Sequence, residues 1–127
     1  MIDSFAKLLL RVSVGGMMLP HGINKIQNGI EFIKKVMTSS GLPEFFAYGI
    51  FVGEVVAPLL LIIGYKTKWA AYIVSFNIFV AVMLVHSGDI FKLTKYGAWA
   101  IETQMFYIIA GLVIAFLGAG RFSVDKQ

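Results

Sequence analysis

The sequence contains no cysteine, little charge and only three prolines. Without cysteine, the 127-residue chain cannot form a disulfide, use a thiolate nucleophile or hold a metal cluster through thiolate ligands of its own. Charged residues make up 14% of the chain and hydrophobic residues 58%, against about a quarter and about a half in an average soluble domain. A chain this short cannot bury such an apolar excess within itself, which favours lipid as its surroundings.

The net charge of +4 does not by itself indicate nucleic acid, because the basic residues are scattered among the segments between apolar runs. This distribution is typical of loops that anchor and orient membrane helices. We therefore expect a lipid bilayer, and not nucleic acid, as the partner. The first apolar run continues into Pro20-His21-Gly22 without a small-x-small cleavage site, so we expect no cleavable signal peptide.

Four apolar runs divide the chain, at about residues 5–22, 45–63, 69–86 and 98–117. Each has about 18 to 20 residues, enough to cross a hydrocarbon core of about 30 Å at about 1.5 Å per residue. The sequence therefore predicts a single all-α transmembrane domain over residues 1–127, an integral membrane four-helix bundle. Both termini then lie on one side, and Lys66 and Lys68 in the shortest loop favour the cytoplasm for that side.

The connection between the first two runs has a helical pattern of its own. Four apolar residues recur there with polar residues between them: Ile26, Ile30, Ile33 and Met37. We expect a short amphipathic helix lying on the membrane surface between the first two transmembrane helices. The segment Ser39-Ser40-Gly41-Leu42-Pro43 would end it.

The second run has one internal carboxylate, Glu54. Small residues recur every four positions around it, Gly49, Gly53 and Ala57, and predict a face that another helix can approach closely. Pro58 lies four residues after Glu54, where its ring disturbs the Glu54 carbonyl. We therefore expect the helix to kink at this carboxylate.

Three polar residues lie at similar depth in three different runs: Arg11, Glu54 and Asn77. A lone charge at that depth costs at least about 3 kcal/mol, so we expect Arg11 and Glu54 to face inward and pair. The pair could either contact a ligand or only orient the helices. Asn77 could likewise contact a ligand or hold two helices together.

A second polar layer is expected at the opposite ends of the runs. Its members are His21, Asn24 and Lys25 after the first run, His86 after the third and Glu102 early in the fourth. Above a buried Glu54 they could form a proton-handling pocket. The alternative for each residue alone is an interfacial side chain that meets water and lipid headgroups.

Two short segments resemble each other, Met18-Leu-Pro-His21 and Met83-Leu-Val-His86. Each precedes a helix with a carboxylate, so an internal parallel repeat is one hypothesis. Methionine and histidine three residues apart could also bind Cu(I), through Met18, His21, Met83 and His86. The alternative is that these methionines only pack in the apolar interior.

Together these residues resemble the DoxX family of small bacterial membrane proteins, over nearly the whole chain. The resemblance rests on the order of several motifs: Arg11 with Gly15, His21-Gly22 with Lys25, Gly53-Glu54, Gly64-Tyr-Lys-Thr-Lys-Trp-Ala-Ala71, Glu102 and Gly118-Ala-Gly-Arg-Phe-Ser-Val-Asp125. Two positions depart from the family pattern, Lys68 in place of arginine and Val124 in place of leucine. The resemblance implies a four-helix bundle in the bacterial cytoplasmic (inner) membrane.

The resemblance also implies a redox association, since family members are linked to quinone-coupled sulfur oxidation and to oxidative-stress complexes. Similar bundles reduce quinones through cysteine pairs, a mechanism that this chain cannot perform alone. Our leading hypothesis is a membrane subunit of a redox system that contacts a quinone or another small redox molecule between its helices. Partner subunits would supply the electron carrier, and a homo-oligomer is an alternative assembly. A non-enzymatic assembly factor or scaffold, or a small-molecule transporter, are the alternative functions.

In that hypothesis Glu54 and His21 transfer protons and Glu102 completes the pocket. Arg11 either keeps Glu54 ionised or binds a quinone carbonyl. The remaining ligand contacts would come from Lys25, Asn77 and His86.

Overall fold

The computed structural model describes residues 2–125 and is almost entirely helical. Four regular helices are α1 (Ile2–Asn28), α2 (Glu31–Ser39), α5 (Thr67–Val85) and α6 (Glu102–Leu117). Between α2 and α5 runs a composite helix of four pieces: η1 (Glu44–Tyr48), α3 (Gly49–Phe51), η2 (Val52–Val56) and α4 (Ala57–Ile63). A short 3₁₀ turn, η3 (Ser87–Asp89), follows α5. The described residues form no β-strand, only one isolated bridge between Leu93 and Trp99, and the predicted all-α class is confirmed.

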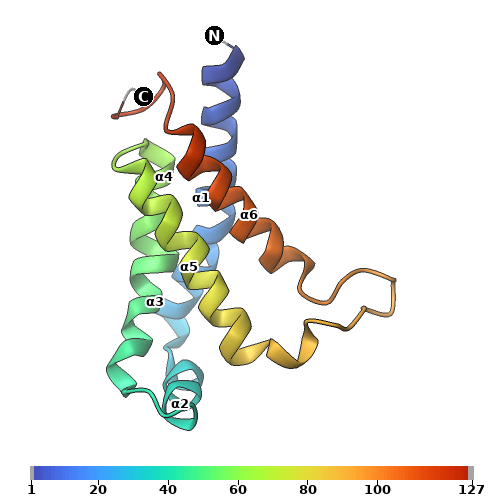
Figure 1. The fold of residues 1–127 in the computed structure, drawn as a ribbon. Coiled ribbons are helices and arrows are strands. Elements are labelled where there is room, and N and C mark those ends of the chain that lie inside the picture. Colours follow the sequence, from blue (N-terminus) through green and yellow to red (C-terminus); the bar gives the residue numbers. More distant parts are fainter. Residues whose placement is uncertain (1, 126–127) are drawn as a thin grey trace.

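The long helices run up and down beside one another (Figure 1). α1 packs against η2 and α4, α4 packs against α5, and α5 packs against α6. The two ends of the chain lie at one end of the molecule, while α2 lies at the other, below α3 (Figure 1). A buried cluster between the helices includes Met18, Leu61, Val74 and Ile114.

Large apolar side chains also cover the outside of the helices. Exposed examples are Leu9, Met17, Val52, Val56, Leu59, Phe76, Phe79, Phe106, Ile109 and Phe116. Two segments among the described residues are long and apolar enough to cross a membrane, Glu44–Ile63 and Thr67–Val85, and α6 is a shorter apolar helix. Outward-facing apolar surface of this extent is expected where lipid and not water surrounds a protein.

The first helix is longer than predicted, because α1 continues through Pro20 to Asn28. Proline removes one backbone hydrogen bond, but packing on both sides of it holds the helix together. Met18 and Gly22 are both buried, and a Cβ at Gly22 would meet the backbone of Glu54. The helix stops instead before Gly29, whose φ of +82° glycine adopts at no steric cost.

The amphipathic helix is present as α2, although Ile26 belongs to α1 and not to it. Lys34 connects α2 to η1: its ammonium lies 3.8 Å from the Glu44 carboxylate and 5.0 Å from the centre of the Tyr48 ring. Exposed contacts of this kind are individually weak. Together they hold α2 beside η1, with its apolar face turned toward α5.

We predicted a kink at Glu54, and the structure has a π-turn there, η2. Pro58 lacks an N–H and its ring crowds the carbonyl four residues earlier, so the backbone bulges there. The close-packing face is confirmed at Gly53, where a Cβ would meet the Asn77 side chain, and at buried Ala57. A Cβ at Gly49, in contrast, would meet nothing within 4 Å.

The fourth helix begins at Glu102, four residues later than predicted. The preceding residues form a turn instead: the amide of Ala100 donates to the Lys92 carbonyl and the amide of Glu102 donates to the Trp99 carbonyl. The predicted third helix agrees with α5 to within two residues.

Candidate functional site

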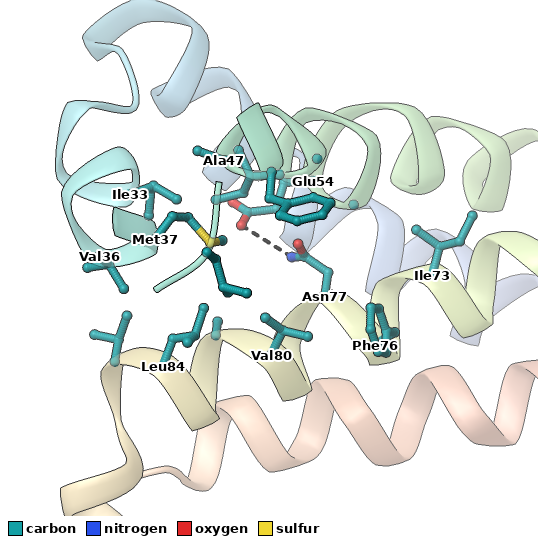
Figure 2. A pocket seen from close by; sticks show the side chains of 17 residues that line it. Ile33, Val36, Met37, Ala47, Glu54, Ile73, Phe76, Asn77, Val80 and Leu84 are labelled. Atoms are coloured by element: carbon teal, nitrogen blue, oxygen red, sulfur yellow. Dashed lines mark hydrogen bonds between the residues drawn. The ribbon is translucent and has the colours of Figure 1, made fainter. Parts of the chain in front are cut away.

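A pocket of about 460 Å³ lies between α2, the η1–α3–η2 segment and α5. Seventeen residues line it, and Glu54 and Asn77 are its only polar ones within the described chain. Figure 2 shows these two side chains pointing at each other, with Met37 and Leu84 among the apolar residues around them. Small-molecule sites typically have this size and this combination of apolar walls with few polar groups.

Glu54 is the buried centre of this site, with 6% of the residue exposed. Asn77 donates a hydrogen bond from Nδ2 to Glu54 Oε2 at 3.3 Å. On the other side, Lys25 Nζ lies 3.5 Å from Glu54 Oε1. The ammonium is an ion-pair partner at this distance, but Oε1 accepts no hydrogen bond from the described residues. Glu54 therefore lies between a cation on α1 and an amide on α5.

Glycines allow three elements to meet at Glu54. Gly22 on α1 lies against the Glu54 backbone, and Gly53 on η2 lies against Asn77. Any larger residue at either position would push α1 or α5 away from η2. The π-turn at residues 52–56 contains both Gly53 and Glu54. The local backbone geometry and the close helix packing together bring the Glu54 carboxylate next to Lys25 and Asn77.

The mouth of the pocket is apolar and faces outward. Phe76 on α5 is 68% exposed, and Phe46 on η1 is 50% exposed, yet both also line the cavity. An apolar tail on a ligand could therefore pass between η1 and α5 onto the outer surface of the helices.

The predicted pair between Arg11 and Glu54 is wrong. Arg11 is fully buried and donates from Nη1 to the carbonyls of Leu61 at 2.8 Å and Ile62 at 3.4 Å. Its Nη2 donates to the Phe122 carbonyl at 2.6 Å. The cause is the turn after α4, where backbone carbonyls without helical partners meet the returning C-terminal segment. Arg11 thus stabilises backbone at the opposite end of α4 from Glu54.

Asp125 also binds the turn between α4 and α5, and we call the bonds that Arg11 and Asp125 make there the clamp. Its carboxylate accepts hydrogen bonds from the amides of Lys66 at 3.0 Å and Thr67 at 2.8 Å, at the start of α5. Its own amide donates to the Gly64 carbonyl at 2.9 Å. Burial by itself raises the pKa of Asp125, yet these bonds and the nearby charge of Arg11 together hold the pKa below its ordinary value. The two longest motifs that resemble the DoxX family, at residues 64–71 and 118–125, therefore bind each other and form one structural unit.

The predicted second polar layer is only partly assembled at Glu54. Lys25 reaches it, but His21 is exposed and meets the Tyr107 ring on α6, with ring centres 6.4 Å apart. His86 Nδ1 lies 3.4 Å from Asp89 in the turn after α5. Glu102 is exposed at the start of α6. His21, His86 and Glu102 are absent from the lining of the Glu54 pocket, so the structure does not bring them together with it.

The Met–His segments differ in their local structure. Met18 is buried in the core and its helix continues past His21, whereas Met83 is 49% exposed and its helix ends just before His86. Within residues 2–125, no group of three or more His, Asp or Glu side chains is arranged to hold a metal ion.

Sequence reasoning missed the contribution of α2 and η1 to the pocket. The sequence predicted a ligand between the long helices, and the cavity at Glu54 is lined by α2 and η1 as well as by α3, η2 and α5. The apolar face of the amphipathic segment was the available signal, since Ile33 and Met37 on that face line the pocket.

Comparison with known proteins gives a consistent family assignment. A Bacillus subtilis protein called "Putative oxidoreductase CatD" is 33% identical over 78 residues, which is 61% of this chain and 58% of that protein. An uncharacterized protein of Haemophilus influenzae is 29% identical over 124 residues, covering 93% of this chain and 87% of that protein. No solved structure matches the chain. Residues 6–87, more than half of the sequence, match DoxX, and the chain therefore belongs to the DoxX family.

Proposed function

We propose that the protein crosses the bacterial cytoplasmic membrane four times, with α1, the η1–α4 segment, α5 and α6 as a four-helix bundle. Family membership, the apolar outer surface and the alternating helix directions support this arrangement. In this bundle α2 lies at the membrane interface. Lys66 and Lys68, in the short turn after α4, favour a cytoplasmic location for that turn and for both termini.

The function that fits the site best is a membrane subunit of a redox system that binds a quinone-type molecule in the Glu54 pocket. The observation that carries this proposal is the buried Glu54 carboxylate, bound by Asn77, in the wall of a cavity whose other lining residues are apolar. A quinone-type molecule combines a flat, oxygen-bearing head with an apolar tail. The Glu54 and Asn77 side chains match the head, and the outward-facing mouth beside Phe76 matches the tail. The name of the Bacillus subtilis relative supports the redox assignment.

The structure changes the roles expected from the sequence. Lys25, and not Arg11, is the cation that lies against the Glu54 carboxylate. Asn77 orients the carboxylate through its amide. A bound head group would lie within reach of Glu54, which could hold or accept a proton from it. Partner subunits that contain an electron carrier are part of this proposal.

A pair of glycine variants tests the proposal. Gly49 lines the pocket and Gly16 lies on the exposed face of α1, and a Cβ at either position would meet nothing within 4 Å. Both adopt helical backbone conformations. Leucine at Gly49 should therefore fill the pocket, whereas leucine at Gly16 should extend harmlessly outward.

The full-length protein and both variants would be placed in lipid nanodiscs and titrated with ubiquinone-1, with bound ligand measured by equilibrium dialysis. We expect Gly49→Leu to weaken binding at least tenfold and Gly16→Leu to change it less than twofold. Organic extracts of the protein purified from native membranes should contain a quinone by mass spectrometry. Equal binding by Gly49→Leu and the unmodified chain would place any ligand elsewhere. Absence of binding by the unmodified protein would contradict the function.

A further inference from the structure

The polar end of the pocket offers mainly hydrogen-bond acceptors. An ionised carboxylate accepts hydrogen bonds and donates none, and each of its oxygens can take two. Glu54 Oε2 accepts one bond from Asn77, and Oε1 accepts none among the described residues. The carboxylate thus keeps unused acceptor capacity while being almost wholly buried.

The orientation of Asn77 follows from the same ionised group. Its NH₂ must face the acceptor-only carboxylate, as the bond from Nδ2 to Glu54 shows. One amide hydrogen is used in this bond, which leaves a single neutral donor beside a charged acceptor. Because hydrogen bonds to a charged group are roughly twice as strong as neutral ones, the carboxylate should determine which ligand form binds.

The charge at the site also selects against a cationic ligand. Lys25 already lies 3.5 Å from Glu54 and offsets its charge, and Lys25 does not itself line the pocket. An ammonium group in the pocket would place a second cation on one carboxylate. A carbonyl oxygen in the same place would face another acceptor. A neutral hydroxyl group satisfies the site without either conflict.

We propose that the Glu54 pocket selects the reduced, hydroxyl-bearing quinol over the oxidised quinone, with a ring hydroxyl donating its hydrogen to the Glu54 carboxylate. This inference rests on the proposed function and specifies its ligand. Asn77 acts as a positioning residue, because its amide holds the carboxylate toward the cavity. The selectivity comes from Glu54 Oε2, the oxygen on the Asn77 side of the carboxylate, which accepts one hydrogen bond in the described chain and can accept a second.

The test compares three ligands with the same short tail under anaerobic conditions. Ubiquinol-1, ubiquinone-1 and the dimethyl ether of ubiquinol-1 would be titrated into the nanodisc-embedded full chain, with bound ligand measured by equilibrium dialysis. We expect the quinol to bind about 10- to 100-fold more tightly than the quinone, the range expected for one hydrogen bond to a charged group. The dimethyl ether keeps the aromatic ring and the tail of the quinol but has no hydroxyl hydrogen, so it should bind no better than the quinone.

The variant Glu54→Gln should reduce the quinol preference to less than about threefold, because the amide also presents a donor. The variant Gly16→Leu, on the outer face of α1, should keep the preference of the unmodified protein. Equal affinities, or tighter quinone binding, would overturn this inference while leaving the proposed function in place. If none of the three ligands binds, the proposed function itself fails. If Glu54→Gln does not fold, the ether comparison on the unmodified chain gives the decision.

Discussion

Reversing the charges of Lys25 and Glu54 together is the sharpest test of the structure, because the sequence alone pointed to a different pair. Glu54 lies 3.5 Å from Lys25, whereas Arg11 binds carbonyls that begin at Leu61. Leu61 lies seven residues beyond Glu54, or about 10 Å along a helix at about 1.5 Å per residue. We therefore expect strong energetic coupling between Lys25 and Glu54 and almost none between Arg11 and Glu54.

The expected magnitude follows from the distance and the exposure. Two unit charges 3.5 Å apart interact by about 1 kcal/mol in water and about 5 kcal/mol at an effective dielectric constant of about 20. The Lys25 side chain is 25% exposed and that of Glu54 is 8% exposed, so the interaction energy of this partly solvated pair should lie between these two values. We expect a coupling energy of about 2 kcal/mol for Lys25 with Glu54. For Arg11 with Glu54 we expect less than about 0.5 kcal/mol, the usual limit for sites that share no partner.

Each coupling energy is measured by a double-mutant cycle, which needs two single variants and one double variant. One set is Lys25→Glu, Glu54→Lys and both together, and the other is Arg11→Glu, Glu54→Arg and both together. Unfolding free energies would be measured by titrating SDS into mixed lipid–detergent micelles while following tryptophan fluorescence. The first double variant should recover much of the stability lost by its single variants, and the second should not. Coupling below about 0.5 kcal/mol for Lys25 with Glu54, or above about 1 kcal/mol for Arg11 with Glu54, would refute the assigned contacts.

Two further predictions concern the clamp at the other end of the helices. Replacing Arg11 by methionine leaves the carbonyls of Leu61, Ile62 and Phe122 without their donor, so we expect the free energy of unfolding to fall by about 3–5 kcal/mol in the same SDS titration, at about 1–3 kcal/mol for each buried acceptor left unsatisfied. Arg11→Lys should lose less, about 1.5–3 kcal/mol, because its ammonium keeps some of these bonds but cannot reach both the α4 carbonyls and the Phe122 carbonyl. Losses of the same size for Arg11→Lys and Arg11→Met would contradict the assigned geometry. Asp125→Ala removes the acceptor for two amides at the start of α5 and should cost about 1 kcal/mol at neutral pH. Because the folded-state pKa of Asp125 lies below its ordinary value, this contribution is complete above about pH 4 and is lost as pH falls through the folded pKa. Thermal unfolding of both proteins between pH 7 and pH 3 should therefore show the difference shrinking with acid, and a difference that is constant or grows would count against the interaction.

Much of the fold follows from local patterns in the sequence. The apolar runs located α5 to within two residues and the second helix to within one, and Pro58 located the distortion at Glu54. The same local reasoning erred where packing outweighs intrinsic preference. Pro20 did not end α1, because Met18 and Gly22 on both sides of it are buried against neighbouring helices.

The candidate site was less predictable than the fold. Glu54 and Asn77 were recognised because polar residues inside apolar runs are expensive and need partners. Counting from the predicted helix ends placed Arg11 at the same depth as Glu54, but Arg11 binds carbonyls that begin at Leu61, about 10 Å further along the helix. Lys25 reached Glu54 only because α1 continued a full turn past the end that Pro20 suggested.

The sequence by itself determined that this chain is helical, apolar on its outer surfaces and without cysteine, because these properties depend on composition and on spacing within each segment. Only the tertiary structure decided which charges meet and where the cavity lies. The partner of Glu54 depends on how far α1 continues and on its position along η2 and α4, and the pocket depends on how α2 folds back toward α5. Both are set by contacts between residues far apart in the chain, among them the close approaches at Gly22 and Gly53.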